Sequence, residues 1–198
     1  YNTGIGKSAL GANTTASNNT SVGYLAMLAN TTGANNTALG SNALKANTEG
    51  TTNTAIGATA LDANTTGIRN VAVGYAALGA GTTGDQNVAL GTFALDANTT
   101  ADGNTAVGYA ALTDNQTGTN NVAVGQFALA NSTVNDNTAV GASAMEATTT
   151  GRINVAVGQN SMAANTTGGD NTAVGGLTLD SNTTGSNNTA LGYGTLSN

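Results

Sequence analysis

The chain has 198 residues, only 7% of them are charged, and its formal net charge is −6. It contains no Cys and no His, which excludes disulfides and thiolate metal sites and leaves only a carboxylate pair or a Ser/Lys dyad for catalysis. The negative charge disfavours nucleic acids and anionic membranes as partners, and no apolar run approaches the length of a membrane span.

One phrase of the form N-[TV]-A-[VIL]-G recurs along the whole chain. It begins at Asn2, Asn19, Asn36, Asn53, Asn70, Asn87, Asn104, Asn121, Asn137, Asn154, Asn171 and Asn188. Successive copies are 17 residues apart, except for the 16 residues between Asn121 and Asn137. A fixed period of this length is typical of a solenoid. We therefore expect a single repeat domain over residues 1–198 with twelve coils, and we number repeat positions 1 to 17 from the phrase's Asn.

Positions 1 to 4 predict a short strand. Position 2 is always Thr or Val, position 4 is always Val, Ile or Leu, and position 3 is nearly always Ala. Since side chains alternate between the faces of a strand, positions 2 and 4 share a face. We interpret that face as the core, together with position 9, which is always Leu or Met. The predicted core therefore includes Val22, Val73, Val107, Val140, Val174, Leu44, Leu78 and Leu112.

Two corners and a second strand complete each predicted coil. Position 5 is always Gly, as at Gly23, Gly74, Gly108 and Gly141, and Gly tolerates the positive φ that a sharp corner needs. A second strand is expected over positions 7 to 11, and the frequent run NTTG at positions 12 to 15 has turn chemistry. The resulting fold class is all-β, a parallel β-solenoid (β-roll) of about twelve 17-residue coils. We expect the shorter repeat to lose its residue at the NTTG corner, because a strand that lost one would exchange its faces.

Asn is constant at position 1 and frequent at position 12. Stacked coils bring identical amides about 4.8 Å apart, so we expect hydrogen-bonded Asn ladders along the rod. A row of Thr at position 14, interrupted by Glu49, raises the alternative of an ice-binding solenoid. The Gly-rich run at 79–84 occupies the turn positions of its repeat, and the acidic residues are scattered, so no cofactor and no metal site are predicted.

Aromatic residues gather beside the first corner. Position 6 or 7 holds Tyr24, Tyr75, Phe93, Tyr109, Phe127 and Tyr193. We expect these side chains to form contacts, either between copies of the chain or on a binding surface. The small residues at positions 3 and 8, such as Ala72, Ala77, Ala89, Ala94, Ala106 and Ala111, provide an alternative lateral contact. Neither end of the chain carries an atypical repeat, which favours a segment of a longer fibre or a subunit that stacks end to end.

The phrases NTAVG, NVAVG, NTAIG and NTSVG resemble the S-V-A-I-G core of the head repeats in YadA-type trimeric autotransporter adhesins. The longer phrase NTAVGYAAL…NTTG is similar to repeats of bacteriophage tail fibres and large bacterial surface proteins. The resemblance covers the whole chain, although its 17-residue period is longer than that of the adhesin heads. It implies a β-roll that associates side by side, commonly in threes, into an adhesive fibre without an active site. The expected location is extracellular, on a cell surface or on a virion, and the expected partners are other copies of the chain and a surface receptor or glycan.

Overall fold

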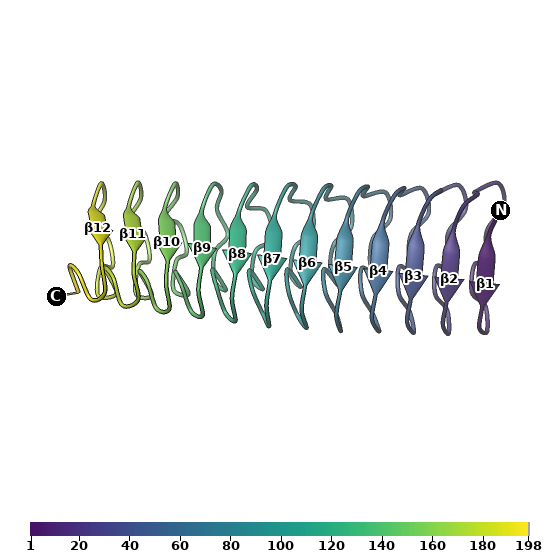
Figure 1. Cartoon of the computed structure of the whole chain (residues 1–198). Helices are drawn as coiled ribbons and strands as arrows, with labels where there is room; N and C mark the ends of the chain where they lie inside the picture. The colour runs from purple at the N-terminus through teal and green to yellow at the C-terminus, as the bar shows by residue number, and fades with distance from the viewer. Residues whose placement is uncertain (198) are drawn as a thin grey trace.

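The computed structural model describes residues 1–197 and consists of twelve short parallel strands in a single row (Figure 1). The strands are β1 (Thr3–Ile5), β2 (Thr20–Val22), β3 (Thr37–Leu39), β4 (Thr54–Ile56), β5 (Val71–Val73), β6 (Val88–Leu90), β7 (Thr105–Val107), β8 (Val122–Val124), β9 (Thr138–Val140), β10 (Val155–Val157), β11 (Thr172–Val174) and β12 (Thr189–Leu191). Each strand pairs only with its neighbours in the sequence, so their order in the sheet is the order of the chain. The predicted all-β parallel solenoid is confirmed.

Equivalent repeat positions pair across the whole sheet. Ala106 lies opposite Ala123, and Val107 lies opposite Val124. The shorter repeat keeps this register, because Val140 pairs with both Val124 and Val157. The missing residue is therefore taken from the NTTG corner, as the sequence predicted. The Thr133 hydroxyl donates to the Thr149 carbonyl, as position-13 threonines do, so position 14 is the one that is lost.

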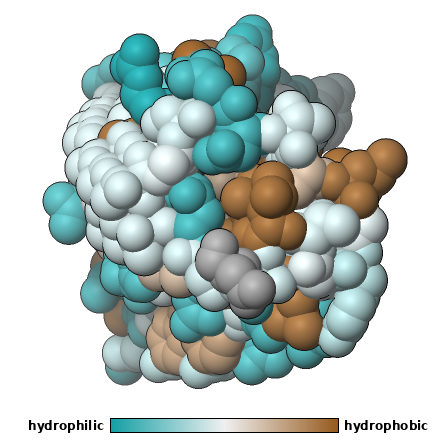
Figure 2. Space-filling view, turned by 90° about the vertical axis from the view of Figure 1, so that its left-hand side faces the viewer, coloured by the Kyte–Doolittle hydropathy of each residue, from teal (hydrophilic) through white to brown (hydrophobic). Residues whose placement is uncertain are grey.

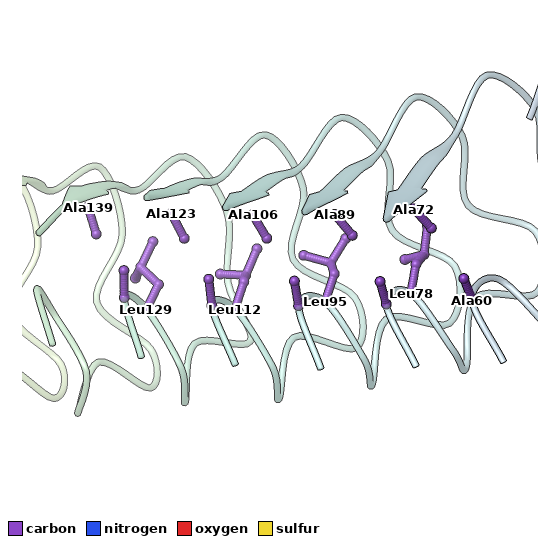
Figure 3. Close-up of a cluster of buried hydrophobic side chains, with 14 of the residues drawn as sticks. Ala60, Ala72, Leu78, Ala89, Leu95, Ala106, Leu112, Ala123, Leu129 and Ala139 are labelled. Carbon is purple, nitrogen blue, oxygen red and sulfur yellow. The ribbon is translucent and has the colours of Figure 1, made fainter. Parts of the chain in front are cut away.

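The core lies on the opposite face of each strand from the one that the sequence predicted. Position 3 is buried in nearly every coil, and Leu44, Leu78 and Leu112 at position 9 are buried as expected. In Figure 3 the alanines of the strands point towards the leucines on the other side of the coil. Position 4 faces outward, which corrects the expected core role of Val22, Val73, Val107, Val140 and Val174; all five are only partly buried.

The narrow interior explains this orientation. Each central coil encloses an Ala at position 3, a small residue at position 8 and one Leu or Met at position 9. Close packing leaves no space for a branched side chain opposite that Leu, and overpacking a filled core costs about 1–3 kcal/mol. Ala at position 3 is therefore the residue that fits the inside. The β-branched residues of positions 2 and 4 stabilise the extended backbone from the outside.

The second strand predicted over positions 7 to 11 is replaced by a series of tight turns. The position-8 amide of Ala94 donates to the Gly91 carbonyl at 3.2 Å, and the position-12 amide of Asn98 donates to the Leu95 carbonyl at 3.2 Å. Positions 7 and 9 take positive φ, 58° at Phe93 and 55° at Leu95. This conformation costs a non-Gly residue roughly 1–2 kcal/mol. Burial of the Leu, about 1.5–3 kcal/mol, offsets that cost.

The first corner depends on Gly for two reasons. The φ angles of Gly23, Gly74, Gly108 and Gly141 lie between 136° and 141°, a region that side chains disfavour. The corners also stack closely: a Cβ on Gly108 would lie 2.6 Å from the carbonyl oxygen of Gly125 in the next coil. The structure confirms these four residues as corner glycines.

The predicted Asn ladders are also present. At position 1, the side-chain NH₂ group of Asn53 donates to the Gly67 carbonyl of its own coil. The side-chain oxygen of Asn53 accepts a hydrogen bond from the backbone N–H of Asn70 in the next coil. At position 12, the Asn64 side chain donates to that of Asn47 at 2.8 Å, and Asn47 donates to Asn30 at 2.7 Å. Both ladders satisfy backbone groups that the corners would otherwise leave without partners.

Candidate interaction surface

Two rows of outward-facing side chains follow the sheet from β1 to β12, and we call them the aliphatic face. Position 2 contributes Thr3, Thr20, Thr37, Thr54, Val71, Val88, Thr105, Val122, Thr138, Val155, Thr172 and Thr189; position 4 contributes Ile5, Val22, Leu39, Ile56, Val73, Leu90, Val107, Val124, Val140, Val157, Val174 and Leu191. The aliphatic face contains no charged residue. Leu39 is 48% exposed, and Leu90 is 37% exposed. The position-4 row is aliphatic in every coil, and an exposed apolar row of this kind is typical of an interaction site.

Figure 2 shows the rod end on, from the side of β12. Polar and weakly polar residues cover most of the outline, while strongly apolar residues reach the surface in restricted areas. Because the coil repeats, the aliphatic face continues along the axis of the rod from β1 to β12.

The small-residue rows are not a contact surface. Ala72, Ala77, Ala89, Ala94, Ala106 and Ala111 are all fully buried. The expectation that positions 3 and 8 form the lateral contact is therefore wrong. The strand places position 3 inside, and positions 2 and 4 occupy the outside instead.

The predicted contact aromatics divide into two groups. Tyr75, Phe93, Tyr109 and Phe127 lie in four consecutive coils and contact one another edge to face, with ring centroids 5.5, 6.2 and 5.4 Å apart. We call these four residues the aromatic ladder. Tyr75 and Tyr109 are 53% and 47% exposed. Tyr24 and Tyr193 are also exposed, but they lie in distant coils and do not join the ladder.

Two carboxylates lie on a different side of the coil, at position 10. Burial raises the pKa of both carboxyl groups, Asp62 and Asp96, and at Asp62 it is the largest of several effects. Lys45 opposes the shift of Asp62, and Asp96 adds to it. Between them lies Gly79, where a Cβ would meet an Asp96 carboxylate oxygen at 2.8 Å. Among residues 1–197 the structure has no group of three or more His, Cys, Asp or Glu side chains placed to hold a metal ion.

The Gly-rich run at 79–84 forms an ordinary turn of its coil. The Gly81 amide donates to the Leu78 carbonyl at 3.2 Å, as position 12 does elsewhere in the solenoid. Gly81 also interrupts the position-12 Asn ladder, and the Asn64 side-chain oxygen next to it is buried without a hydrogen-bond partner. The substitution of Gly at this position is therefore a local gap in the ladder.

Sequence reasoning missed the aliphatic face, although the sequence contained a signal for it. Position 3 accepts only Gly, Ser and Ala, and such a size limit is typical of a closed interior.

Comparison with protein families, characterised proteins and solved structures gave no match for this chain. In the described part of the chain, no helix has the length and apolar character needed to cross a membrane.

Proposed function

We propose that this protein is a structural component of an extracellular or virion fibre, that copies of it associate side by side, and that the fibre serves adhesion rather than catalysis. The observation that carries the proposal is the aliphatic face. It is uncharged, it runs from β1 to β12, and it leaves large residues such as Leu39 and Leu191 exposed to solvent. When a second apolar surface covers a surface of this kind, the burial stabilises the complex by about 25 cal/mol per Å² of apolar area buried.

The shape of the sheet supports lateral association. The strands form one regular row with a single register, so a second copy aligned with the rod axis meets an equivalent side chain at every coil. Burial of a small area in each coil then adds up over twelve strands. We expect each interface to bury more than about 1,000 Å², as specific interfaces do. The resemblance of the repeats to adhesin heads and tail fibres supports assembly in threes and a location outside the cell.

Light scattering after size-exclusion chromatography tests this proposal. We expect the mass of at least two chains at micromolar concentration, and a trimer or a longer fibre in negative-stain images. The double variant Val73→Lys and Val107→Lys places two ammonium groups on the aliphatic face and should lower the mass towards that of one chain. Its matched control is Thr66→Lys and Thr100→Lys, which adds the same charge at exposed position 14. A single-chain mass for the unchanged protein, or equal effects of the two double variants, would contradict side-by-side assembly.

Ice binding is the second candidate, and one observation favours it. Eight of the twelve outward position-2 residues are Thr, and they lie on the sheet itself rather than in the corner where the sequence had suggested a Thr row. Adjacent coils set these hydroxyls about 4.8 Å apart in a regular array. A monomeric protein that produces thermal hysteresis, with loss of the effect in Thr37→Lys, would replace the fibre proposal by this one.

A further inference from the structure

The aromatic ladder is a local feature within an otherwise uniform surface. Its four rings occupy coils five to eight, and each meets the next nearly at a right angle, with interplanar angles of 85°, 80° and 86°. Edge-to-face packing of this kind is favourable and holds each ring in a defined orientation. A ligand that stacks on these rings therefore loses little free energy in ordering them.

The residues at position 6 alternate in chemistry along the ladder. Tyr75 is followed by Thr92, then by Tyr109 and then by Gln126. A hydrogen-bonding side chain thus follows each phenol ring in the next coil. The two tyrosines are two coils apart, which corresponds to about 9.6 Å along the rod. Along position 6, phenol rings and polar side chains therefore alternate, and each kind recurs every two coils.

Charge limits the class of ligand. Lys7, in the first coil, is the only charged residue at positions 6 and 7 of any repeat. The ladder presents two phenol hydroxyls, and Thr92 and Gln126 in the same coils add a hydroxyl and an amide. The whole chain has a net charge of −6. These groups do not compensate a sulfate, phosphate or carboxylate on a ligand, and the net charge opposes an anionic polymer. The surface therefore suits a neutral ligand that is both hydroxylated and apolar on one side.

We propose that the aromatic ladder binds a neutral, extended glycan built of β-linked pyranose units. The apolar C–H face of a pyranose stacks on the electron-rich face of a phenol ring. The interval between Tyr75 and Tyr109 is close to the length of one disaccharide in a β-1,4-linked chain, so every second sugar meets a ring. Thr92 and Gln126, in the coils that follow Tyr75 and Tyr109, supply a hydroxyl and an amide for hydrogen bonds to sugar hydroxyls. This inference deepens the adhesive part of the proposed function, and it does not depend on side-by-side assembly.

The same ladder is less suited to contact with a second copy of the chain. A lateral contact that uses the repeat extends over all coils, as the aliphatic face does, whereas the ladder covers only four consecutive coils. The equivalent positions in coils three, four and nine are Ser, Asn, Ala and Thr. A bounded row with polar side chains between its rings has the composition of a ligand site.

The proposal can be tested by affinity electrophoresis in native gels. The gels contain either hydroxyethyl cellulose or soluble glycol chitin that is free of chitosan. We expect both neutral polysaccharides to retard the unchanged protein, and heparin to leave its mobility unaffected. Titration with cellohexaose and with the hexamer of N-acetylglucosamine should quench tyrosine fluorescence, since the chain has no Trp. The double variant Tyr75→Ala and Tyr109→Ala should bind at least tenfold more weakly. Tyr24→Ala with Tyr193→Ala is the matched control, because it removes two exposed tyrosines outside the ladder, and it should bind as the unchanged protein does.

Two results would overturn glycan binding at the ladder, and a third would reassign the ladder to contact between copies. The first is the absence of retardation and quenching with every neutral glycan probe. The second is an equal loss of binding in the ladder variant and in its control. Light scattering on the same samples separates this inference from the fibre proposal: a ladder variant that lowers the assembled mass and leaves glycan binding unchanged would assign the ladder to contact between copies. Retained glycan binding in the Val73→Lys and Val107→Lys variant would show that binding does not require assembly.

Discussion

Asn and Gly residues connect each coil to the next at its corners. The position-1 Asn donates within its own coil and accepts from the next one, as Asn53 does with Gly67 and Asn70. Gly at position 5 permits the close approach of neighbouring corners, because in every coil that has a following coil a Cβ there would collide with the carbonyl group of the next corner Gly. These two residues recur without exception, because each satisfies a requirement of the backbone that few other side chains meet.

Filling the gap in the position-12 ladder should stabilise the protein. In Gly81→Asn, the new amide can donate to the buried Asn64 oxygen, which has no partner. One such hydrogen bond contributes about 1 kcal/mol, and replacing Gly adds about 0.4–1 kcal/mol through the unfolded chain. A Cβ at this site lies 3.1 Å from the Leu78 side chain, which must shift slightly. Urea unfolding should rank Gly81→Asn above Gly81→Ala, the control without an amide, and equal stability of the two would refute the ladder effect.

The carboxylate of Asp96 should make stability depend on pH. Burial raises its pKa in the folded state above the ordinary value of 3.8. Below that ordinary value both states are protonated and the penalty is absent; as pH rises through the raised pKa, the folded state ionises at a cost and stability is lost. At pH 7 the free energy of unfolding of Asp96→Asn should therefore exceed that of the unchanged protein, by less than about 1 kcal/mol because the group is partly solvated. The difference should vanish near pH 3. Asp114→Asn, at an exposed site, is the control, and a difference that persists at pH 3 would exclude ionisation as the cause.

At the scale of the strand, the deciding property is which side faces inward. A three-residue strand has one central residue that points one way and two outer residues that point the other way. Here the central Ala faces the interior, so the more apolar side chains lie outside. Hydrophobicity alone predicts that positions 2 and 4 face the interior. The restriction of position 3 to small residues instead indicates that position 3 does.

Adjacent substitutions in β7 should separate the two faces. Ala106 is fully buried, so Ala106→Asp buries an unpaired carboxylate at a cost of several kcal/mol and should reduce the β-sheet circular dichroism signal through loss of the coils around β7. Val107 is only partly buried, so Val107→Asp should keep that signal, with a change in unfolding free energy of about 1 kcal/mol or less. The opposite ranking of the two variants would restore position 4 to the core.

The solenoid, its period, its strands, its Gly corners and its Asn ladders were all predictable from the sequence, because each repeats in phase. The turns over positions 7 to 11 were not, because Leu rarely takes a positive φ and its hydrophobicity suits a strand equally well. Leu95 adopts that angle in a coil that buries its side chain, and its amide donates to the Ala111 carbonyl of the next coil at 3.0 Å. The aromatic ladder was anticipated as a set of contact residues, but the edge-to-face contacts between successive coils required coordinates.

For the whole molecule, every strand contacts only its sequence neighbours. Stability is then approximately a sum of equivalent coil energies and interfaces between adjacent coils. A local defect such as the ladder gap at Gly81 or the shorter repeat at Asn131 to Asn137 therefore affects its immediate neighbours and leaves distant coils unchanged. The register preserved between β8, β9 and β10 is an example of this independence.

The uniformity of the aliphatic face also bears on how two copies align. When one copy slides along another by a single coil, nearly all aliphatic contacts are re-formed, so neighbouring alignments differ little in free energy. Only features that break the repetition can select one alignment: the four Val residues that replace Thr at position 2, which are Val71, Val88, Val122 and Val155, and the single shorter repeat. In the proposed side-by-side association, a face built from identical units would therefore carry little information about the position of one rod along another, and we expect staggered rods of graded length.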